Sequence, residues 1–92
     1  MSRFLIEVPH EANVGECVRA AEAFIRSGSH FLTHAEWGCM DGDHRALLII
    51  ELGGKDEARN VIPPPFRGNA KIVQLNTFSL EQLAELQRHH QA

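Results

Sequence analysis

The sequence predicts an α+β fold in which a four-stranded antiparallel sheet carries helices on one face. An alternating apolar segment at residues 3–8 is followed by an amphipathic segment at residues 14–25. Two apolar stretches then flank Asp41-Gly42, a pair typical of β-hairpin turns. A second helix-like segment at residues 55–62 precedes a last alternating stretch at residues 71–78. The order of the elements is therefore β-α-β-β-α-β.

Length and composition predict one domain over residues 1–92 and argue against several classes of function. The chain has 92 residues, of which 43% are hydrophobic, as suits a single globular domain. The net charge is −3 and the basic residues are scattered, which argues against binding to nucleic acid. No apolar run approaches the ~20 residues of a membrane span, and residues 1–11 lack the pattern of a signal peptide. With two cysteines in dissimilar contexts, we expect a reduced, cytoplasmic protein.

The first strand and helix follow from local signals. Residues 3–8 alternate weakly, and Pro9 limits the strand. Asn13 offers an N-cap with Glu16 three positions on, and Gly28 lies where the helix should end. The expected buried stripe of this helix consists of Val14, Cys17, Val18, Ala21, Phe24 and Ile25.

A hairpin centred on Asp41-Gly42 pairs residues whose numbers sum to 83. In this register Trp37 faces Ala46 and Glu36 faces Leu47, and one face of the hairpin is almost wholly apolar. A slip by one residue would scramble that sorting, which supports the register. The register continues through the pairs Ala35–Leu48, His34–Ile49, Thr33–Ile50, Leu32–Glu51 and Phe31–Leu52.

The second half of the chain repeats the pattern. The short helix at residues 55–62 should stop at the prolines 63–65, and residues 71–78 should form the fourth strand. Ser79 with Gln82 forms a second capping box, which predicts a C-terminal helix to about residue 89. The whole plan is ferredoxin-like with an added terminal helix.

The helices can cover only one face of such a sheet, so the other face should need a partner. The covered face is expected to hold Phe4, Ile6, Val8, Phe31, Trp37, Leu48, Ile50, Val73 and Leu75. Five apolar residues remain on the other face, namely Leu5, Leu32, Leu47, Ile49 and Ile72. Covering them is worth several kcal/mol at about 25 cal/mol per Å². We therefore expect a homodimer whose sheets face each other.

In architecture and length the chain resembles the dimeric α/β-barrel superfamily. The likeness is carried by the hairpin HFLTHAEWGCMDGDHRALLIIE, the short helix KDEARNVI, the segment PPPF and the strand AKIVQLNTF. Members include antibiotic-biosynthesis-type monooxygenases and muconolactone isomerase-like proteins. The resemblance implies a ferredoxin-like fold, a dimeric barrel, and a ligand or active site in or beside the barrel.

His30 and His34 have the spacing of a two-histidine metal pair on a helix. On the expected strand, however, they would lie about 13 Å apart, too far for nitrogens that each bind zinc at about 2 Å. His34 and Glu36 instead share a face about 7 Å apart and can close around one ion. A third ligand would come from Glu7, from His10 or from a partner subunit. Without a metal, His34 would serve as general acid or base, with Glu36 raising its pKa.

The apolar surroundings of His34 and Glu36 are typical of a small-molecule site. In a simpler interpretation, Glu36 forms a cross-strand ion pair with Arg45, and His34 is a hydrogen-bonded interface residue. The expected ligand-binding residues are Glu7, Arg45, Glu51, Gln74, Asn76, Leu32, Leu47 and Ile49.

The hairpin tip is an alternative metal site. Cys39, Met40 and His44 gather there, with Cys39 opposite His44 in the expected register. Sulfur and imidazole ligands favour Cu(I) or zinc, although a polar tip without metal is the simpler interpretation. Cys17, on the expected apolar stripe, is interpreted as a small core residue.

Three functions remain open from the sequence. The first is a homodimeric barrel that binds a small, partly apolar molecule, with isomerase- or monooxygenase-like proton transfer by His34 and Glu36. The second is a non-catalytic protein that binds a divalent metal such as zinc or copper, at His34 and Glu36 or at Cys39 and His44. The third is a dimerisation module without a site. The cofactor is accordingly either absent or a metal ion.

Overall fold

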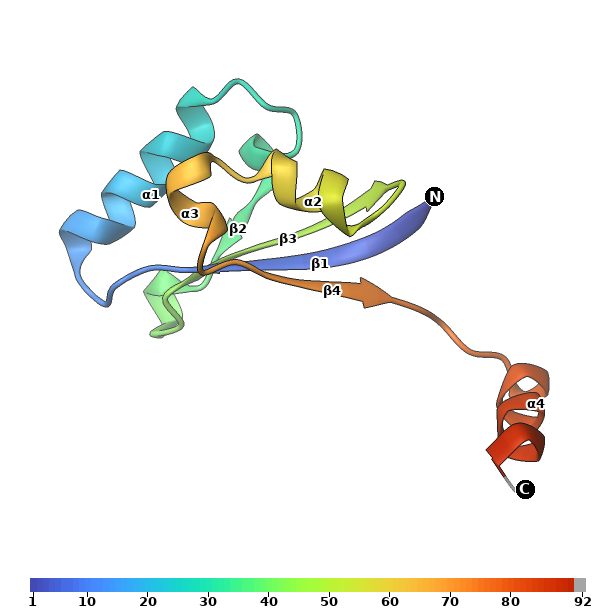
Figure 1. The fold of residues 1–92 in the computed structure, drawn as a ribbon. Coiled ribbons are helices and arrows are strands. Elements are labelled where there is room, and N and C mark those ends of the chain that lie inside the picture. Colours follow the sequence, from blue (N-terminus) through green and yellow to red (C-terminus); the bar gives the residue numbers. More distant parts are fainter. Residues whose placement is uncertain (91–92) are drawn as a thin grey trace.

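The computed structural model describes residues 1–90 and has an α+β fold with a four-stranded antiparallel sheet (Figure 1). The strands lie in the order β2-β3-β1-β4, and each neighbouring pair is antiparallel. In chain order the elements are β1 (Ser2–Pro9), α1 (Val14–Arg26), the 3-10 turn η1 (Leu32–His34), β2 (Glu36–Trp37), the 3-10 turn η2 (Cys39–Asp41), β3 (Arg45–Leu52), α2 (Lys55–Val61), α3 (Pro64–Arg67), β4 (Lys71–Leu75) and α4 (Leu80–His90).

Helices α1, α2 and α3 lie on one side of the sheet, and the core lies between these two layers (Figure 1). Every second residue of β1 and β3 points into this core, as the alternation in the sequence predicts. The buried apolar residues are Phe4, Ile6, Val8, Ala20, Phe24, Leu32, Ala46, Leu48, Ile50, Ala58, Ile62, Phe66 and Ile72.

Helix α1 begins as predicted, but it buries a narrower stripe. The Glu16 backbone N–H donates to Asn13 Oδ1 at 2.8 Å, which confirms the cap. Ala20 and Phe24 are buried and Cys17 is half-buried. The predicted stripe was wrong at three of its members, because the helix turns the 17–20–24 row toward the sheet. Those three, Val14, Val18 and Ile25, are exposed.

The predicted hairpin register is confirmed next to the turn and is wrong further from it. Glu36 pairs with Leu47 and Trp37 with Ala46. Before residue 36 the chain forms η1 instead of a strand, so the pairs predicted from Phe31 to His34 do not form. The cause lies in Ser29, whose hydroxyl accepts from the Leu32 N–H and whose carbonyl accepts from the Thr33 N–H. These bonds favour a turn over a strand.

The turn itself is longer than the predicted two residues. Gly38 O accepts hydrogen bonds from the backbone N–H groups of Asp41 and Asp43, and η2 lies between them. Gly42 has φ of 82°, a conformation that favours glycine. A Cβ on Gly38 would lie 2.6 Å from the Asp43 carbonyl oxygen, so this close approach also requires glycine. The tip is therefore a compact loop rather than a minimal turn.

The predicted face of the fourth strand was wrong. β4 ends at Leu75 rather than Phe78, and it pairs Ile72 with Ile6 and Val73 with Leu5. Ile72 consequently lies in the core, and so does Leu32, which η1 turns inward. Val73 and Leu75 belong instead to the uncovered side of the sheet.

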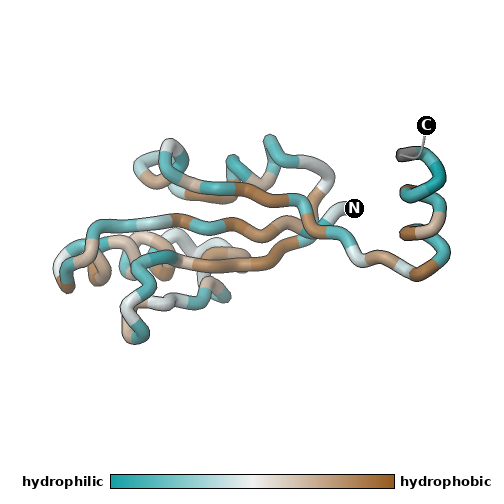
Figure 2. Tube along the Cα trace, turned by 90° about the horizontal axis from the view of Figure 1, so that it is seen from below, coloured by the Kyte–Doolittle hydropathy of each residue, from teal (hydrophilic) through white to brown (hydrophobic). Residues whose placement is uncertain are grey.

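We call this uncovered side the open face. Its central band is apolar and charged residues lie at both ends, as the register requires. It comprises Arg3, Leu5, Glu7, Glu36, Arg45, Leu47, Ile49, Glu51, Lys71, Val73 and Leu75. Figure 2, viewed from below, shows hydrophobic stretches along the strands.

The C-terminal helix α4 stands apart from the sheet in both views (Figures 1 and 2). Its capping box is confirmed, because the Ser79 N–H donates to Gln82 Oε1 and the Gln82 N–H donates to Ser79 Oγ. The radius of gyration is 16.4 Å, against about 12 Å for a compact domain of this length. No helix within residues 1–90 has the length and apolar character needed to cross a membrane.

Candidate functional site

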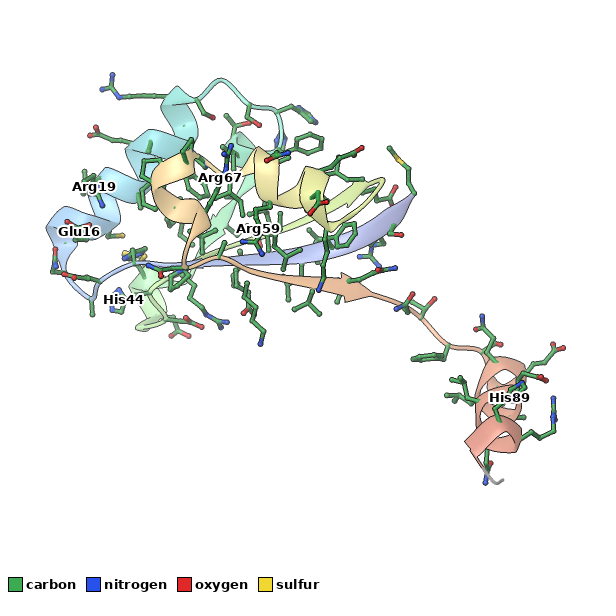
Figure 3. All side chains as sticks on the ribbon, in the orientation of Figure 1. Glu16, Arg19, His44, Arg59, Arg67 and His89 are labelled. Carbon is green, nitrogen blue, oxygen red and sulfur yellow. The ribbon has the colours of Figure 1, made fainter. Side chains whose placement is uncertain are left out.

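The sheet register brings two histidines together at one end of the molecule. β1 and β3 pair residues whose numbers sum to 54, down to Pro9 opposite Arg45. The ladder continues one step further, where the His10 N–H donates to the His44 carbonyl at 3.0 Å. Their rings accordingly lie 5.6 Å apart, centroid to centroid. Figure 3 shows His44 at the end of the sheet that also holds the β1–α1 connection.

The hairpin adds a cysteine to this pair. The Gly38 N–H donates to the Arg45 carbonyl at 3.1 Å, which sets Cys39 beside His44. Ligand atoms of His10, Cys39 and His44 all lie within 4.8 Å of one another, and all three residues are half-buried. We call these three residues the tip site. The predicted pairing of Cys39 with His44 thus brings two of its members together, and β1 supplies the third.

The hydrogen bonds of His10 fix which ring nitrogen faces the sulfur. Its Nδ1 lies 2.9 Å from the Glu11 carbonyl oxygen, which can only accept, so Nδ1 carries the proton. In a neutral imidazole Nε2 is then an acceptor, and it lies 2.9 Å from Cys39 Sγ. The Cys39 S–H therefore donates to His10, and a metal ion can take the place of that proton.

His44 contributes an unsatisfied polar atom. Its Nδ1 is buried and makes no hydrogen bond within the described part of the chain. Leaving such an atom without a partner costs about 1–3 kcal/mol. A buried ring nitrogen without a partner is the kind of group that an ordered ligand satisfies.

The electrostatics of the tip favour a protonated thiol in the absence of a metal. Burial raises the pKa of Cys39, and a hydrogen bond with the Cys17 thiol raises it further. Cys17 is therefore more than the core residue predicted from the sequence, because its thiol contacts the tip site.

Arg45 does not make the cross-strand pair with Glu36 that the sequence suggested. Its guanidinium binds Glu7 at 2.9 Å and Asp43 through two hydrogen bonds. The hydrogen bond with Arg45 lowers the pKa of the Asp43 carboxyl, and the pKa of Arg45 is raised in turn. Arg45 thus ties β1, β3 and the tip loop together, and Glu36 lies across the sheet from it.

His34 and Glu36 do share one hollow on the open face. It has a volume of about 410 Å³ and is lined by Leu5, His34, Glu36, Leu47, Leu48 and Ile49. Both side chains are exposed. His34 Nδ1 donates to the His30 carbonyl at 2.7 Å, so this carbonyl, rather than Glu36, sets its tautomer.

The prediction that His30 and His34 lie far apart was wrong. η1 replaces the expected strand, and the two rings lie 4.6 Å apart. They line a second hollow of about 380 Å³ together with Phe31 and Glu51. A turn brings positions i and i+4 close where a strand would separate them.

The remaining predicted ligand residues do not gather around His34. Glu7 and Arg45 form an ion pair near the tip, and Leu32 lies in the core. Glu51, Gln74 and Asn76 line a separate hollow of about 340 Å³ beside the N-terminus. The predicted site is therefore divided among three places.

The sequence analysis placed His10 only as an optional third ligand for His34 and Glu36, and it did not connect Cys17 with the tip. The hairpin sum of 83 puts Cys39 opposite His44, and the β1–β3 sum of 54 puts His10 opposite the same residue. The missing signal was the second register, which depends on a long-range pairing.

No family model matches this chain, and neither a curated protein nor a solved structure matches it. The functional proposals accordingly depend on the geometry and chemistry of the chain's own residues.

Proposed function

We propose that this protein binds a transition-metal ion at the tip site, through His10, Cys39 and His44. The observation that carries the proposal is the convergence of the three ligand atoms within 4.8 Å. In a tetrahedral zinc site, nitrogen and sulfur ligands stand roughly 3.3–3.6 Å apart. Small side-chain rotations therefore suffice to bring all three onto one ion.

Two features beyond proximity support this proposal. The Glu11 carbonyl orients His10, and metal-bound histidines usually donate their other ring N–H to such an acceptor. A metal ion would also satisfy the unpartnered nitrogen of His44 if that nitrogen is the one turned to the ion. Orientation of one ligand and an unmet bond on another favour a site over a chance cluster.

The donor set restricts the metal. A thiolate with two imidazoles suits zinc or copper, whereas magnesium and calcium prefer oxygen ligands. The set of two histidines and one cysteine also occurs with copper and a weak axial methionine. Met40 is fully exposed beside Cys39 and does not provide that thioether. We therefore favour zinc.

Titration of Zn²⁺ into the metal-free protein tests the proposal. We expect one ion per chain, with binding lost or strongly weakened in His10→Ala, Cys39→Ser and His44→Ala. His30→Ala and His34→Ala are matched controls, because both histidines are exposed and lie outside the tip site. Loss of binding in His34→Ala alone would transfer the metal to the His34 hollow and contradict the tip assignment.

A second candidate function concerns the open face, and it is favoured by the amount of apolar surface left uncovered. Leu5, Leu47, Ile49, Val73 and Leu75 form the band across the sheet. Exposed apolar residues continue along the C-terminal segment at Phe78, Leu80, Leu83 and Leu86. Patches of this kind mark interaction surfaces.

We propose that a second copy of the chain covers the open face, as in a dimeric α/β barrel. The strand order β2-β3-β1-β4 supports the ferredoxin-like plan on which such barrels are built. The detached α4 has no packing partner of comparable extent within its own chain, and a neighbouring protomer would provide one. The hollow at His34 and Glu36 would then lie between the sheets and receive a small, partly apolar molecule.

His34 is the reporter for ligand binding in this second candidate. Candidate ligands that enter the hollow should shift the imidazole resonances of His34 and leave those of His89 on α4 unchanged. A ligand that binds equally well to Leu47→Asp protein would rule out the open face as its site.

A further inference from the structure

The first helix places a second sulfur against the tip site. Cys17 lies on the same face of α1 as Ala20 and Phe24, the two buried residues of that helix. Phe24 contacts the Trp37 ring at 5.1 Å, and Trp37 in turn contacts the His10 ring at 6.0 Å. Residues 17 and 24 are separated by about two turns, or about 10 Å along the axis. The row therefore runs along the helix toward its N-terminal end, near residues 10 and 39.

The contact with Cys39 locates the Cys17 thiol more closely. The two thiols interact through their side chains, and both residues are half-buried. Cys39 Sγ thus has two neighbours, the Cys17 thiol and His10 Nε2. A metal ion bound by Cys39 and His10 would meet Cys17 as the adjacent donor.

Other nearby groups that might complete the coordination are engaged elsewhere. The Asp43 carboxylate binds Arg45 through both oxygens. The Glu16 carboxylate binds Arg19 at 3.0 Å, and the Glu11 carbonyl binds His10. Cys17 is the neighbouring donor whose bond, to another thiol, is weak and readily exchanged for a metal bond.

We infer that Cys17 is the fourth ligand and that the tip holds a closed, tetrahedral two-cysteine, two-histidine zinc site. The inference rests on the proposed metal binding and extends it from three ligands to four. Three protein ligands plus water are typical of catalytic zinc, whereas four protein ligands are typical of structural zinc. The site would then join α1, the end of β1 and the hairpin tip, and its role would be structural.

Cobalt substitution counts the sulfur ligands directly. Tetrahedral Co²⁺ gives visible d–d bands, and its sulfur-to-metal charge-transfer absorption grows with the number of thiolates. Full-length protein is titrated with Co²⁺ and then with Zn²⁺ under a phosphine reductant. The variants are Cys17→Ser and Cys39→Ser. Ala21→Ser, a small change on the same helix, is the matched control.

With four ligands, Cys17→Ser should retain roughly half of the charge-transfer absorption and bind Zn²⁺ at least about tenfold more weakly, because even outer-shell changes cost that much. Ala21→Ser should match the unmodified chain. An unchanged spectrum and Zn²⁺ affinity in Cys17→Ser would overturn the fourth ligand and leave the three-ligand proposal intact. If the unmodified chain binds neither Co²⁺ nor Zn²⁺, the proposed function itself fails.

Alkylation of the unmodified chain gives an answer that does not depend on how a variant folds. Iodoacetamide labelling is followed at each cysteine by peptide mass spectrometry, with and without Zn²⁺. One equivalent of Zn²⁺ should slow the labelling of Cys17 and Cys39 together. Protection of Cys39 with unchanged labelling of Cys17 would contradict the inference.

Discussion

Zinc should raise the thermal stability of this chain by a large and calculable amount. His10 Nε2 and Cys39 Sγ lie 2.9 Å apart, and a tetrahedral site needs about 3.6 Å, so the two atoms have to separate by only about 0.7 Å. The ordering of the two loops is already complete in the folded chain. Little of the binding energy should therefore be spent on rearrangement.

The size of the effect follows from mass action. A free Zn²⁺ concentration 100 times the dissociation constant stabilises the folded state by about 2.7 kcal/mol, provided that the unfolded chain does not bind. For a domain of this length, each kcal/mol raises Tm by about 4–8 °C. We expect Tm to rise by about 11–22 °C in buffered Zn²⁺, and by less if the unfolded cysteines and histidines also hold the ion.

Circular dichroism melts in the presence of EDTA and in buffered Zn²⁺ measure this difference. His44→Ala should remove the rise, whereas His34→Ala should retain it. A shift of less than about 2 °C for the unmodified chain in saturating Zn²⁺ would refute the idea that the tip is preformed for a metal.

Three further predictions concern pH, the tip loop and the open face. Because metal displaces the thiol protons and the pKa of Cys39 is raised, Zn²⁺ affinity should increase with pH by about tenfold per unit for each thiol bound, up to the thiol pKa; calorimetry at several pH values checks the slope, and a flat profile above pH 7 would argue against thiolate ligands. Gly38→Ala places a Cβ 2.6 Å from the Asp43 oxygen and should cost about 1–3 kcal/mol of unfolding free energy in urea, together with a loss of Zn²⁺ affinity. Gly68→Ala, which has helical φ and open space, is its control and should be neutral or slightly stabilising. Ile49→Asp on the open face should convert a dimer of twice 10.3 kDa into a monomer in light-scattering chromatography, whereas Val18→Asp, at similar exposure on α1, should not; an unmodified chain that is monomeric at every concentration would contradict the dimer.

Local signals predicted most of the fold. The Asn13 and Ser79 caps define the starts of α1 and α4, and both form the expected hydrogen bonds. The Glu36–Leu47 register also followed from the turn and from apolar sorting. Such features depend on neighbours in sequence, so composition and spacing are sufficient to find them.

The errors arose where two local patterns compete or where pairing is long-range. Residues 29–34 alternate like a strand, but Ser29 bonds stabilise a turn that carries Leu32 into the core. Ile72 and Val73 are both apolar, so the strand's own alternation does not decide its face, and the pairing with β1 does. His10 and His44 are 34 positions apart, and only the β1–β3 ladder places one beside the other.

X-ray absorption at the zinc edge tests the metal site most directly, because it reports the atoms bound to the ion. The full chain is loaded with one equivalent of Zn²⁺, and His34→Ala protein is measured in parallel. We predict sulfur scattering at about 2.3 Å together with imidazole nitrogen at about 2.0–2.1 Å, identical in both proteins. A shell of nitrogen and oxygen alone, without sulfur, would contradict the tip site.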